Sequence, residues 1–240
     1  MTNVSVVIPI KNEADNIRPL IDRIVAALEP LTSFEVIVVN DGSTDHSSEV
    51  VENAALSYNN LSLLKHASSA GQSAAVHSGV LAAKAPFIAT LDGDGQNPPE
   101  DLPKLLMPLL EKSAGPELGL VAGQRVGRQD RFSKKIASKL ANGLRGFLLQ
   151  DGTRDTGCGL KAFRREAFLQ LPYFNHMHRY LPALFKAYGW DVAHVDVSHA
   201  ARVAGRSNYS NLQRGLVGAV DLLGVIWLIR RAKRAQIVKK

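Results

Sequence analysis

Residues 4–28 read VSVVIPIKNEADNIRPLIDRIVAAL, and this stretch decides the class of fold. Its first seven residues, Val4–Ile10, are mostly apolar and β-branched, which is typical of a buried strand. Apolar residues then recur three and four positions apart, at Ile17, Leu20, Ile21, Ile24, Val25 and Leu28. This spacing predicts a helix with one apolar face, which Pro30 is expected to end. A buried strand followed by an amphipathic helix indicates a parallel sheet covered by helices.

The same alternation continues through the first half of the chain. Further strands are predicted at Phe34–Val39, Leu61–Lys65, Phe87–Leu91 and Leu118–Gly123, with helical segments near residues 72–83 and 98–112. Ser43 or Thr44 is placed to cap the helix after the second strand. We therefore expect a Rossmann-like α/β fold with a mostly parallel sheet flanked by helices. Its 240 residues suit one main domain, residues 1–210, with an appendage at residues 211–240.

Composition and glycine patterns exclude several classes of protein. The single cysteine, Cys158, cannot form an intramolecular disulfide or a thiolate metal cage, which favours a reducing, cytosolic compartment. No basic region followed by an apolar one opens the sequence, so no secretory signal peptide is predicted. The Gly-x-Gly-x-x-Gly pattern of dinucleotide-binding folds and the Gly-x-x-x-x-Gly-Lys-Ser/Thr phosphate loop are both missing. A bound diphosphate would need another source of positive charge.

The net charge of +7 is concentrated at the C-terminal end. Residues 201–240 hold nine Lys or Arg and one acid, a net charge of +8, which leaves −1 for residues 1–200. A basic tail beside an apolar segment favours an anionic membrane surface over nucleic acid as the partner. A tail that only keeps the protein in solution is the alternative interpretation.

Polar side chains follow four of the predicted strands. They are Pro9-Ile10-Lys11-Asn12-Glu13, Asn40-Asp41, Asp92-Gly93-Asp94-Gly95-Gln96 and Arg125. Open α/β sheets bind ligands at the carboxyl ends of their strands, so we expect these residues to cluster. Asp92 and Asp94, with the amide of Gln96, offer the oxygen ligands that Mg²⁺ or Mn²⁺ prefers. An Asp-x-Asp is also common in turns, and the position at a strand end favours the metal site.

Other polar residues carry weaker signals. A carboxylate such as Asp41, at the end of a strand, can accept hydrogen bonds from a base or ribose. The alternative is a helix-initiating turn, which Asp45 could equally provide. His176 and His178 lack a third ligand at metal spacing, so structural or hydrogen-bonding roles are predicted for them.

These motifs carry a resemblance to a known family. SVVIPIKNE (residues 5–13), VVNDGSTD (38–45) and LDGDGQNPPE (91–100) resemble successive motifs of the family 2 inverting glycosyltransferases, which have the GT-A fold. Residues 96–100, DTGCGLK (155–161), HRYLPAL (178–184) and RVAGRSNY (202–209) resemble the polyprenyl-phosphate branch, typified by dolichyl-phosphate mannose synthase. The resemblance spans about residues 4–210, with its motifs in the expected order.

The resemblance implies an inverting transfer of a sugar from a UDP- or GDP-sugar donor to a polyprenyl phosphate. It assigns nucleotide-sugar binding to Pro9, Lys11, Glu13, Asn40, Asp41, Asp92, Arg202 and Ser207, and the divalent metal to Asp92, Asp94 and Gln96. It assigns the acceptor phosphate to Lys134, Lys135 and Ser138, and we expect catalysis to involve Asp94, Arg125 and Asp155. The branch usually has Ser-Lys-Tyr where this chain has Ser207-Asn208-Tyr209, a loss of positive charge that Arg206 could replace.

A lipid phosphate does not strictly need a general base. Its second pKa is about 6, so it is largely ionised near neutral pH. Asp155 is the candidate if a base or a sugar-orienting carboxylate exists. Its alternative role is to cap the turn at Thr156-Gly157.

Two segments are candidates for membrane contact. Residues 215–229 form a largely apolar run that Asp221 interrupts and basic residues 230–234 follow. The run is shorter than the roughly 20 residues that span a bilayer, so we expect a helix lying in the interface, with Trp227 near its boundary. A buried or oligomer-interface helix is the alternative. Residues 131–149 separate a basic from an apolar face, although an ordinary surface helix would do the same.

The sequence therefore predicts an enzyme held peripherally or monotopically at the cytoplasmic face of the cell membrane. A short anchor leaves room for an integral-membrane partner or a homo-oligomer. One alternative is a GT-A enzyme that acts on a soluble or protein-linked glycan. Another is a non-catalytic nucleotide-binding subunit, against which the complete acidic motif argues.

Overall fold

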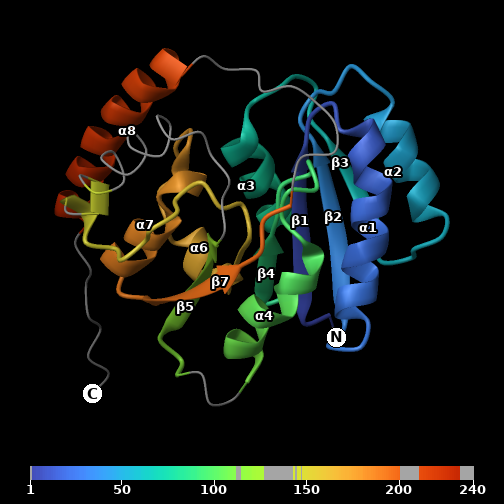
Figure 1. Cartoon of the computed structure of the whole chain (residues 1–240), viewed down its shortest axis with the longest axis horizontal. Coiled ribbons are helices and arrows are strands. Elements are labelled where there is room, and N and C mark those ends of the chain that lie inside the picture. The colour runs from blue at the N-terminus through green and yellow to red at the C-terminus, as the bar shows by residue number, and fades with distance from the viewer. Residues whose placement is uncertain are drawn as a thin grey trace, which may run out of the picture.

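The fold is built on a seven-stranded sheet, seen in a computed structural model that describes residues 2–111, 115–126, 143, 145, 146, 148–200 and 211–232. The strands are β1 (Val4–Ile10), β2 (Phe34–Asn40), β3 (Leu61–Lys65), β4 (Phe87–Thr90), β5 (Leu118–Arg125), β6 (Lys161–Arg164) and β7 (Asp191–Val197). Their order is β3-β2-β1-β4-β6-β5-β7 (Figure 1). Neighbouring strands are parallel except at β6, which runs antiparallel to both β4 and β5. The predicted mostly parallel α/β sheet is confirmed.

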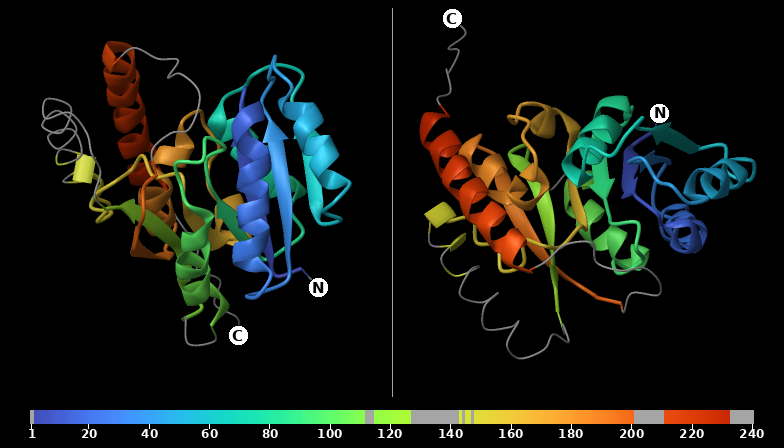
Figure 2. Two further views of the ribbon diagram at one scale, coloured as in Figure 1. Left: turned by 45° about the vertical axis from the view of Figure 1, so that its right-hand side comes forward. Right: turned by 90° about the horizontal axis from the view of Figure 1, so that it is seen from above.

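Helices cover both faces of this sheet. They are α1 (Ala14–Leu28), α2 (Ser47–Ala55), α3 (Gln72–Ala82), α4 (Leu102–Leu110), α6 (Arg165–Leu169), α7 (Leu181–Ala187) and α8 (Asn211–Arg231), with the 3-10 turns η1 (Pro99–Asp101) and η2 (Met177–Arg179). Apolar residues of α1, α2 and α4 share one core cluster, and those of α3, α6 and α7 share the other. Figure 2 shows these two layers from further directions.

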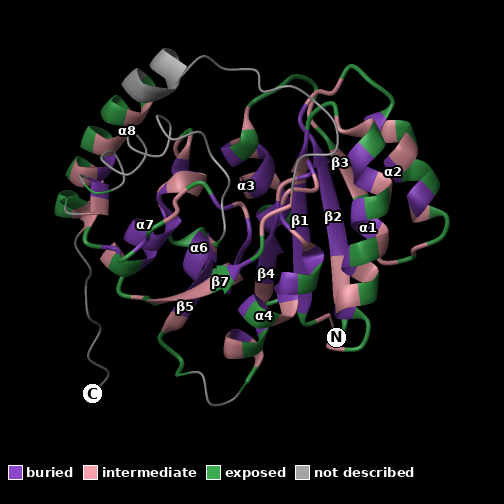
Figure 3. Cartoon of the chain, viewed as in Figure 1, coloured by how far each residue is buried: buried purple, intermediate pink, exposed green. Residues whose placement is uncertain are grey.

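The two cores follow from the alternation of side chains along each strand. On β1, Val4, Val6 and Ile8 are fully buried in the first cluster, whereas Val7 is buried in the second. Each such buried side chain contributes about 1.5–3 kcal/mol relative to an exposed one. Both faces of β1 are therefore apolar, and Figure 3 shows it buried at the centre of the molecule. Polar side chains that could bind a ligand are therefore expected at the ends of such strands.

The start of α2 corrects one prediction. Neither Ser43 nor Thr44 caps this helix, which begins at Ser47 after His46 with no side-chain cap. The hydroxyl of Ser43 instead accepts a hydrogen bond from the backbone N–H of Asn12, 2.9 Å away. The loop after β2 is thus tied to the loop after β1, and this tie competes with helix capping for the same hydroxyl.

Helix α8 packs against the edge of the second core. Val225 is 1% exposed there, and the Asp221 carboxylate lies 2.8 Å from Nδ1 of His176 in the loop before η2. Its other face carries exposed apolar side chains, of which Leu223 is 69% and Trp227 60% exposed. The Arg231 guanidinium lies over the Trp227 ring. Within the described residues, none of the helices has the length and apolar character needed to cross a bilayer.

Candidate functional site

The carboxyl ends of β1, β2 and β4 converge, as the strand-end pattern led us to expect. The backbone N–H of Asp41 donates to the carbonyl of Ile10 at 2.9 Å, which joins the ends of β2 and β1. A Cβ at Gly93 would stand 2.6 Å from Cγ2 of Ile10 and 3.2 Å from the carbonyl oxygen of Pro9. Only glycine permits this approach, so Gly93 is what brings Asp92 and Asp94 against the end of β1.

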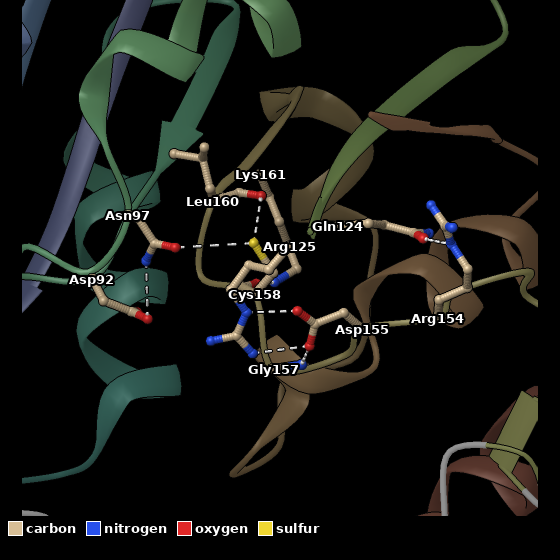
Figure 4. Close-up of polar contacts among 10 residues, drawn as sticks. All are labelled: Asp92, Asn97, Gln124, Arg125, Arg154, Asp155, Gly157, Cys158, Leu160 and Lys161. Atoms are coloured by element: carbon tan, nitrogen blue, oxygen red, sulfur yellow. Dashed lines mark hydrogen bonds and ion pairs between the residues drawn. The ribbon is translucent and has the colours of Figure 1, made fainter. Parts of the chain in front are cut away.

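The carboxylates of Asp92 and Asp94 are both held by neighbouring donors. Oδ1 of Asp94 accepts from the backbone N–H of Gln96 at 3.1 Å, and the Asp94 side chain is buried. Oδ1 of Asp92 accepts from Nε2 of Gln72 at 2.7 Å, and its Oδ2 from Nδ2 of Asn97 at 3.3 Å. Figure 4 shows Asn97 between the Asp92 carboxylate and the thiol of Cys158. Each Asp92 oxygen therefore accepts one side-chain amide and retains a second lone pair.

A basic group faces this acid pair from the end of β5. Nε and Nη2 of Arg125 donate to the two carboxylate oxygens of Asp155 at 2.6 and 2.9 Å, a bidentate pair (Figure 4). Oδ1 of Asp155 also accepts from the backbone N–H of Gly157 at 3.1 Å. Asp155 thus forms the turn that was its alternative role and, in addition, fixes Arg125. Its role in catalysis stays a prediction.

The electrostatics of the cluster favour an added cation. Burial and then the charge of Asp94 raise the pKa of the Asp92 carboxyl, more than the charges of Lys161 and Arg125 lower it. Burial likewise lowers the pKa of the Lys161 ammonium, which donates to the carbonyl oxygen of Cys158. A divalent ion beside the Asp92 carboxyl would stabilise its ionised form against burial and the charge of Asp94.

The donor set fits such an ion only in part. No group of three or more His, Cys, Asp or Glu residues suited to a metal occurs in the described part of the chain. Mg²⁺ commonly takes one or two protein carboxylates and completes its shell with substrate phosphates and water. Asp92 and Asp94, with the side-chain oxygen of Gln96, match that incomplete set.

Asp41 has a different environment from the acid pair. Its carboxylate accepts four hydrogen bonds, from Nδ1 of His66 (2.7 Å), the hydroxyl of Ser69 (2.7 Å) and the backbone N–H groups of Ala70 (2.8 Å) and Gly71 (2.9 Å). Burial alone would raise the pKa of Asp41, but these hydrogen bonds outweigh it and lower the pKa to about 2. Asp41 therefore holds the loop of residues 66–71. Its contact with a nucleoside stays a prediction.

The turn that was the alternative role for Asp41 belongs to other residues. Oδ1 of Asp45 accepts from the backbone N–H and the hydroxyl of Ser47, at the start of α2. Oδ1 of Asn40 accepts from the backbone N–H of Ser43 at 2.8 Å, and its Nδ2 donates to the hydroxyl of Ser48 at 2.7 Å. Asn40 thus shapes the β2 loop.

The other predicted site residues lie around this centre or outside the description. Lys11 is exposed after β1, and Glu13 accepts from the side-chain amide of Asn16 at the start of α1. The carbonyl of Gln96 accepts from the backbone N–H of Ala200 at 3.0 Å, so the chain returns to the loop of residues 92–97 near residue 200. Arg202, Ser207, Lys134, Lys135 and Ser138 lie outside the described residues.

Four residues of the site were not assigned a role by the sequence: Gln72, Asn97, Gly159 and Lys161. A Cβ at Gly159 would stand 2.4 Å from Oδ2 of Asp92, so this glycine makes room for the carboxylate. Asn97, Gly159 and Lys161 lie within quoted motifs, which was the available signal. Gln72 lies in no motif, so the sequence offered no signal for it. Its contact with Asp92 depends on how the loop of residues 66–71 folds.

The two histidines serve hydrogen bonding, as predicted. Nδ1 of His178 lies 2.7 Å from the hydroxyl of Ser73 at the start of α3, and His176 pairs with Asp221. Burial, followed by the charges of Lys161, Arg179 and His176, lowers the pKa of His178 well below its usual value. The His178 ring is therefore neutral at pH 7, and its Nδ1 can accept from the Ser73 hydroxyl.

Similarity to known proteins assigns the chain to a family. The family model described as Glycosyl transferase family 2 matches residues 5–171. The chain belongs to glycosyl transferase family 2. One relative of this family 2 chain is the undecaprenyl-phosphate 4-deoxy-4-formamido-L-arabinose transferase of Photorhabdus laumondii, 35% identical over 210 residues. Another is the dodecaprenyl-phosphate galacturonate synthase of Rhizobium johnstonii, 34% identical over 239 residues.

These relatives are longer than the family 2 chain. The match to the Photorhabdus protein covers 86% of this chain and 63% of the relative. The match to the Rhizobium protein covers 96% of this chain and 68% of the relative. The chain thus spans about two thirds of the length of both proteins.

Solved structures show the same fold at low sequence identity. Glucosyl-3-phosphoglycerate synthase of Mycobacterium tuberculosis, in complex with Mg²⁺ and UDP, has a TM-score of 0.71 and 20% identity, with 95% of this chain and 79% of that chain covered. A mannosyltransferase of Pyrobaculum calidifontis, in complex with GDP-Man and Mn²⁺, has a TM-score of 0.68 and 21% identity, with 97% and 66% covered. The expected GT-A fold of the family 2 chain is confirmed.

Proposed function

We propose that this family 2 chain is a metal-dependent glycosyltransferase that moves a sugar, with inversion, from a nucleotide-diphosphate donor to a polyprenyl phosphate. The observation that supports this most strongly is the acid pair Asp92 and Asp94, faced by Arg125. The chain carries this pair and also resembles the Photorhabdus and Rhizobium proteins. Those relatives, 34% and 35% identical, are named for polyprenyl-phosphate sugars. The site would offset the negative charge of a departing diphosphate. The relatives suggest that a polyprenyl phosphate receives the sugar.

Asp92, Asp94 and Gln96 are the residues that would hold Mg²⁺ or Mn²⁺. The bound ion would offset the negative charge of the departing diphosphate, as a Lewis acid does. Two structural neighbours, crystallised with Mg²⁺ and UDP or with Mn²⁺ and GDP-Man, support a divalent metal and a UDP- or GDP-sugar. The raised pKa of the Asp92 carboxyl agrees, because a bound cation would stabilise its ionised form.

Arg125 would stabilise the phosphate charge from the opposite side. Asp155 engages Nε and Nη2 of the guanidinium, so the Nη1 group is the part directed away from this pair. An arginine fixed in this way loses little entropy when it binds a phosphate. Arg202 and Ser207 are proposed as further donor contacts through the family resemblance.

Charge and position would suffice for the transfer itself. The acceptor phosphate is largely ionised near pH 7, its second pKa being about 6, so its oxygen can attack the anomeric carbon without a base. Asp155 already accepts from Arg125 and Gly157, which favours an orienting role over proton transfer. Lys134, Lys135 and Ser138 are proposed to hold the acceptor phosphate.

The nucleoside is proposed to lie beyond the acid pair, at the ends of β1 and β2. Pro9, Lys11, Glu13, Asn40 and Asp41 are the proposed contacts. Asp41 accepts four hydrogen bonds from its own protein, which supports a role in shaping that pocket through the loop of residues 66–71. A direct contact of Asp41 with the base would require one of these four hydrogen bonds to be replaced by a hydrogen bond from the nucleoside.

We further propose that residues 1–210 are the catalytic domain and that residues 211–240 associate with the cytoplasmic face of the membrane, peripherally or monotopically. On α8, Asp221 and Val225 face the body of the protein, whereas Leu223 and Trp227 are exposed. An exposed apolar stripe that ends in Arg230 and Arg231 suits an interface rich in anionic lipid. An integral-membrane partner or a second copy could share that surface.

The proposal is tested by transfer from a panel of labelled nucleotide-sugars to undecaprenyl phosphate in detergent with Mn²⁺. The expected result is one labelled glycolipid that disappears when EDTA is added and returns with excess Mn²⁺. A glycolipid unaffected by EDTA would contradict the metal site. Transfer only to soluble or protein-linked glycans would favour the alternative acceptor class.

A further inference from the structure

We infer that Gln72 is a positioning residue for the metal-site carboxylate of Asp92, and that Asp41 sets Gln72 in place through the loop of residues 66–71. The inference rests on the proposed function in one respect, namely that Asp92 takes part in binding a divalent ion. It deepens that function, because it assigns a role to a helix start outside every motif of the sequence.

The orientation of Asp92 is set from three directions. Nε2 of Gln72, at the first residue of α3, donates to Oδ1 at 2.7 Å. Nδ2 of Asn97, from the loop after β4, donates to Oδ2 at 3.3 Å. Gly159 lies against a third side, because even a Cβ there would stand 2.4 Å from the carboxylate. The Gln72 bond is the shorter of the two side-chain bonds, so Gln72 is the stronger determinant.

Gln72 reaches Asp92 because the preceding loop is tied to Asp41. The backbone N–H groups of Ala70 and Gly71, directly before Gln72, both donate to the Asp41 carboxylate. Gly71 has φ +92°, a conformation that L side chains rarely adopt, and it turns the chain into α3. The backbone of Gly42 also contacts the loop closely, since a Cβ there would stand 2.8 Å from the amide nitrogen of Ser69.

Ser73, the residue after Gln72, is held by η2. The buried hydroxyl of Ser73 lies 2.7 Å from Nδ1 of His178 and accepts from the His178 backbone N–H at 3.3 Å. The first turn of α3 is thus held between Asp41 and η2. Gln72 itself is exposed, so its bond to Asp92 competes with water and depends on this rigid support.

Mn²⁺ binding to the full chain in the presence of UDP or GDP tests the inference without a turnover measurement. Gln72→Met keeps the length of the side chain and removes the amide donor. Leu81→Met, an exposed position on the same helix, is the matched control. Mutation of a residue that hydrogen-bonds a metal ligand typically lowers the metal affinity by about 10- to 100-fold. We therefore expect Gln72→Met to weaken Mn²⁺ binding about 10-fold. Leu81→Met should bind as wild type, and the melting temperatures should agree.

A double-mutant cycle with Ser69→Ala tests the link to Asp41. Ser69→Ala removes one hydrogen bond to Asp41 and should weaken Mn²⁺ binding in the wild-type background but not in Gln72→Met. Additive effects would overturn the role of Asp41, and wild-type affinity in Gln72→Met would overturn that of Gln72. Equal losses of Mn²⁺ affinity in Gln72→Met and Leu81→Met would assign the effect to helix stability. That result would also overturn the positioning role of Gln72. Failure of the wild type to bind Mn²⁺ would overturn the metal site and the inference together.

Discussion

At the scale of single residues, Asp41 provides a sharp test of the site's electrostatics. Asp41 is 4% exposed, and its hydrogen bonds lower the pKa of its carboxyl to about 2. In the unfolded chain the pKa of an aspartate is about 3.9. The shift corresponds to about 2–3 kcal/mol of folding free energy, fully present above pH 4–5 and lost as the pH falls toward 2.

We therefore predict that Asp41→Asn lowers the free energy of unfolding by about 2–3 kcal/mol at pH 7. The difference from wild type should be constant above pH 5 and shrink between pH 4 and pH 2.5. Urea denaturation across this range measures it, with Asp15→Asn, an exposed acid on α1, as the control. A difference that stays the same down to pH 2.5 would show that the hydrogen bonds do not depend on the ionised carboxylate.

Gly159 gives a second prediction at this scale. Alanine there would place a Cβ 2.4–2.5 Å from the atoms of the Asp92 carboxylate, so the carboxylate must move. We predict that Gly159→Ala weakens Mn²⁺ binding at least about 10-fold, the effect expected when a ligand is misplaced. Gly115→Ala, where a Cβ would meet nothing within 4 Å, should bind as wild type. Calorimetric titration decides between them, and equal affinities would refute the assigned contact.

At the scale of elements, α8 presents two different apolar faces. Val225 and Leu222 pack against the core beside α7, and the pair of His176 with Asp221 fixes the same face. The opposite face exposes Val220, Leu223 and Trp227. Asp221, which interrupts the apolar run in the sequence, is thus satisfied within the protein and does not oppose membrane contact by the outer face.

We predict that Leu223→Glu combined with Trp227→Glu lowers binding to vesicles that contain phosphatidylglycerol by at least about 10-fold, because the outer face loses its apolar contact. The melting temperature should change little, since both side chains are exposed. Val225→Glu, on the inner face, should instead destabilise the protein by burying a charge. Vesicle co-sedimentation and thermal melts measure both effects. Undiminished vesicle binding by the double variant would exclude this face as the contact.

At the scale of the whole molecule, the sequence predicted strands β1 to β5 better than β6 and β7. Strands β1 to β5 are marked by apolar, β-branched runs, and all five were expected at nearly their observed positions. Strand β6 has only four residues, two of them basic, and it inserts antiparallel between β4 and β5. Such a short segment is buried by its neighbours and not by its own pattern, so local periodicity does not reveal it.

The candidate site was predictable to the extent that it follows strand ends. Asp92, Asp94 and Arg125 come directly after or at the ends of β4 and β5, where an open α/β sheet binds ligands. The Asp41 hydrogen bonds and the contact of Gln72 with Asp92 were not predictable, because they depend on how the loop of residues 66–71 folds. The supporting contacts of the site therefore required the three-dimensional structure.

The most direct test of the central claim is the dependence of lipid glycosylation on Asp94. Wild type and Asp94→Asn are compared with labelled UDP- and GDP-sugars and Mn²⁺, with undecaprenyl phosphate in vesicles or 3-phosphoglycerate as acceptor. We predict transfer to the lipid phosphate alone, reduced on the order of 100-fold or more in Asp94→Asn, whose melting temperature stays near that of wild type. Equal lipid product from both proteins, or transfer to 3-phosphoglycerate alone, would contradict the account.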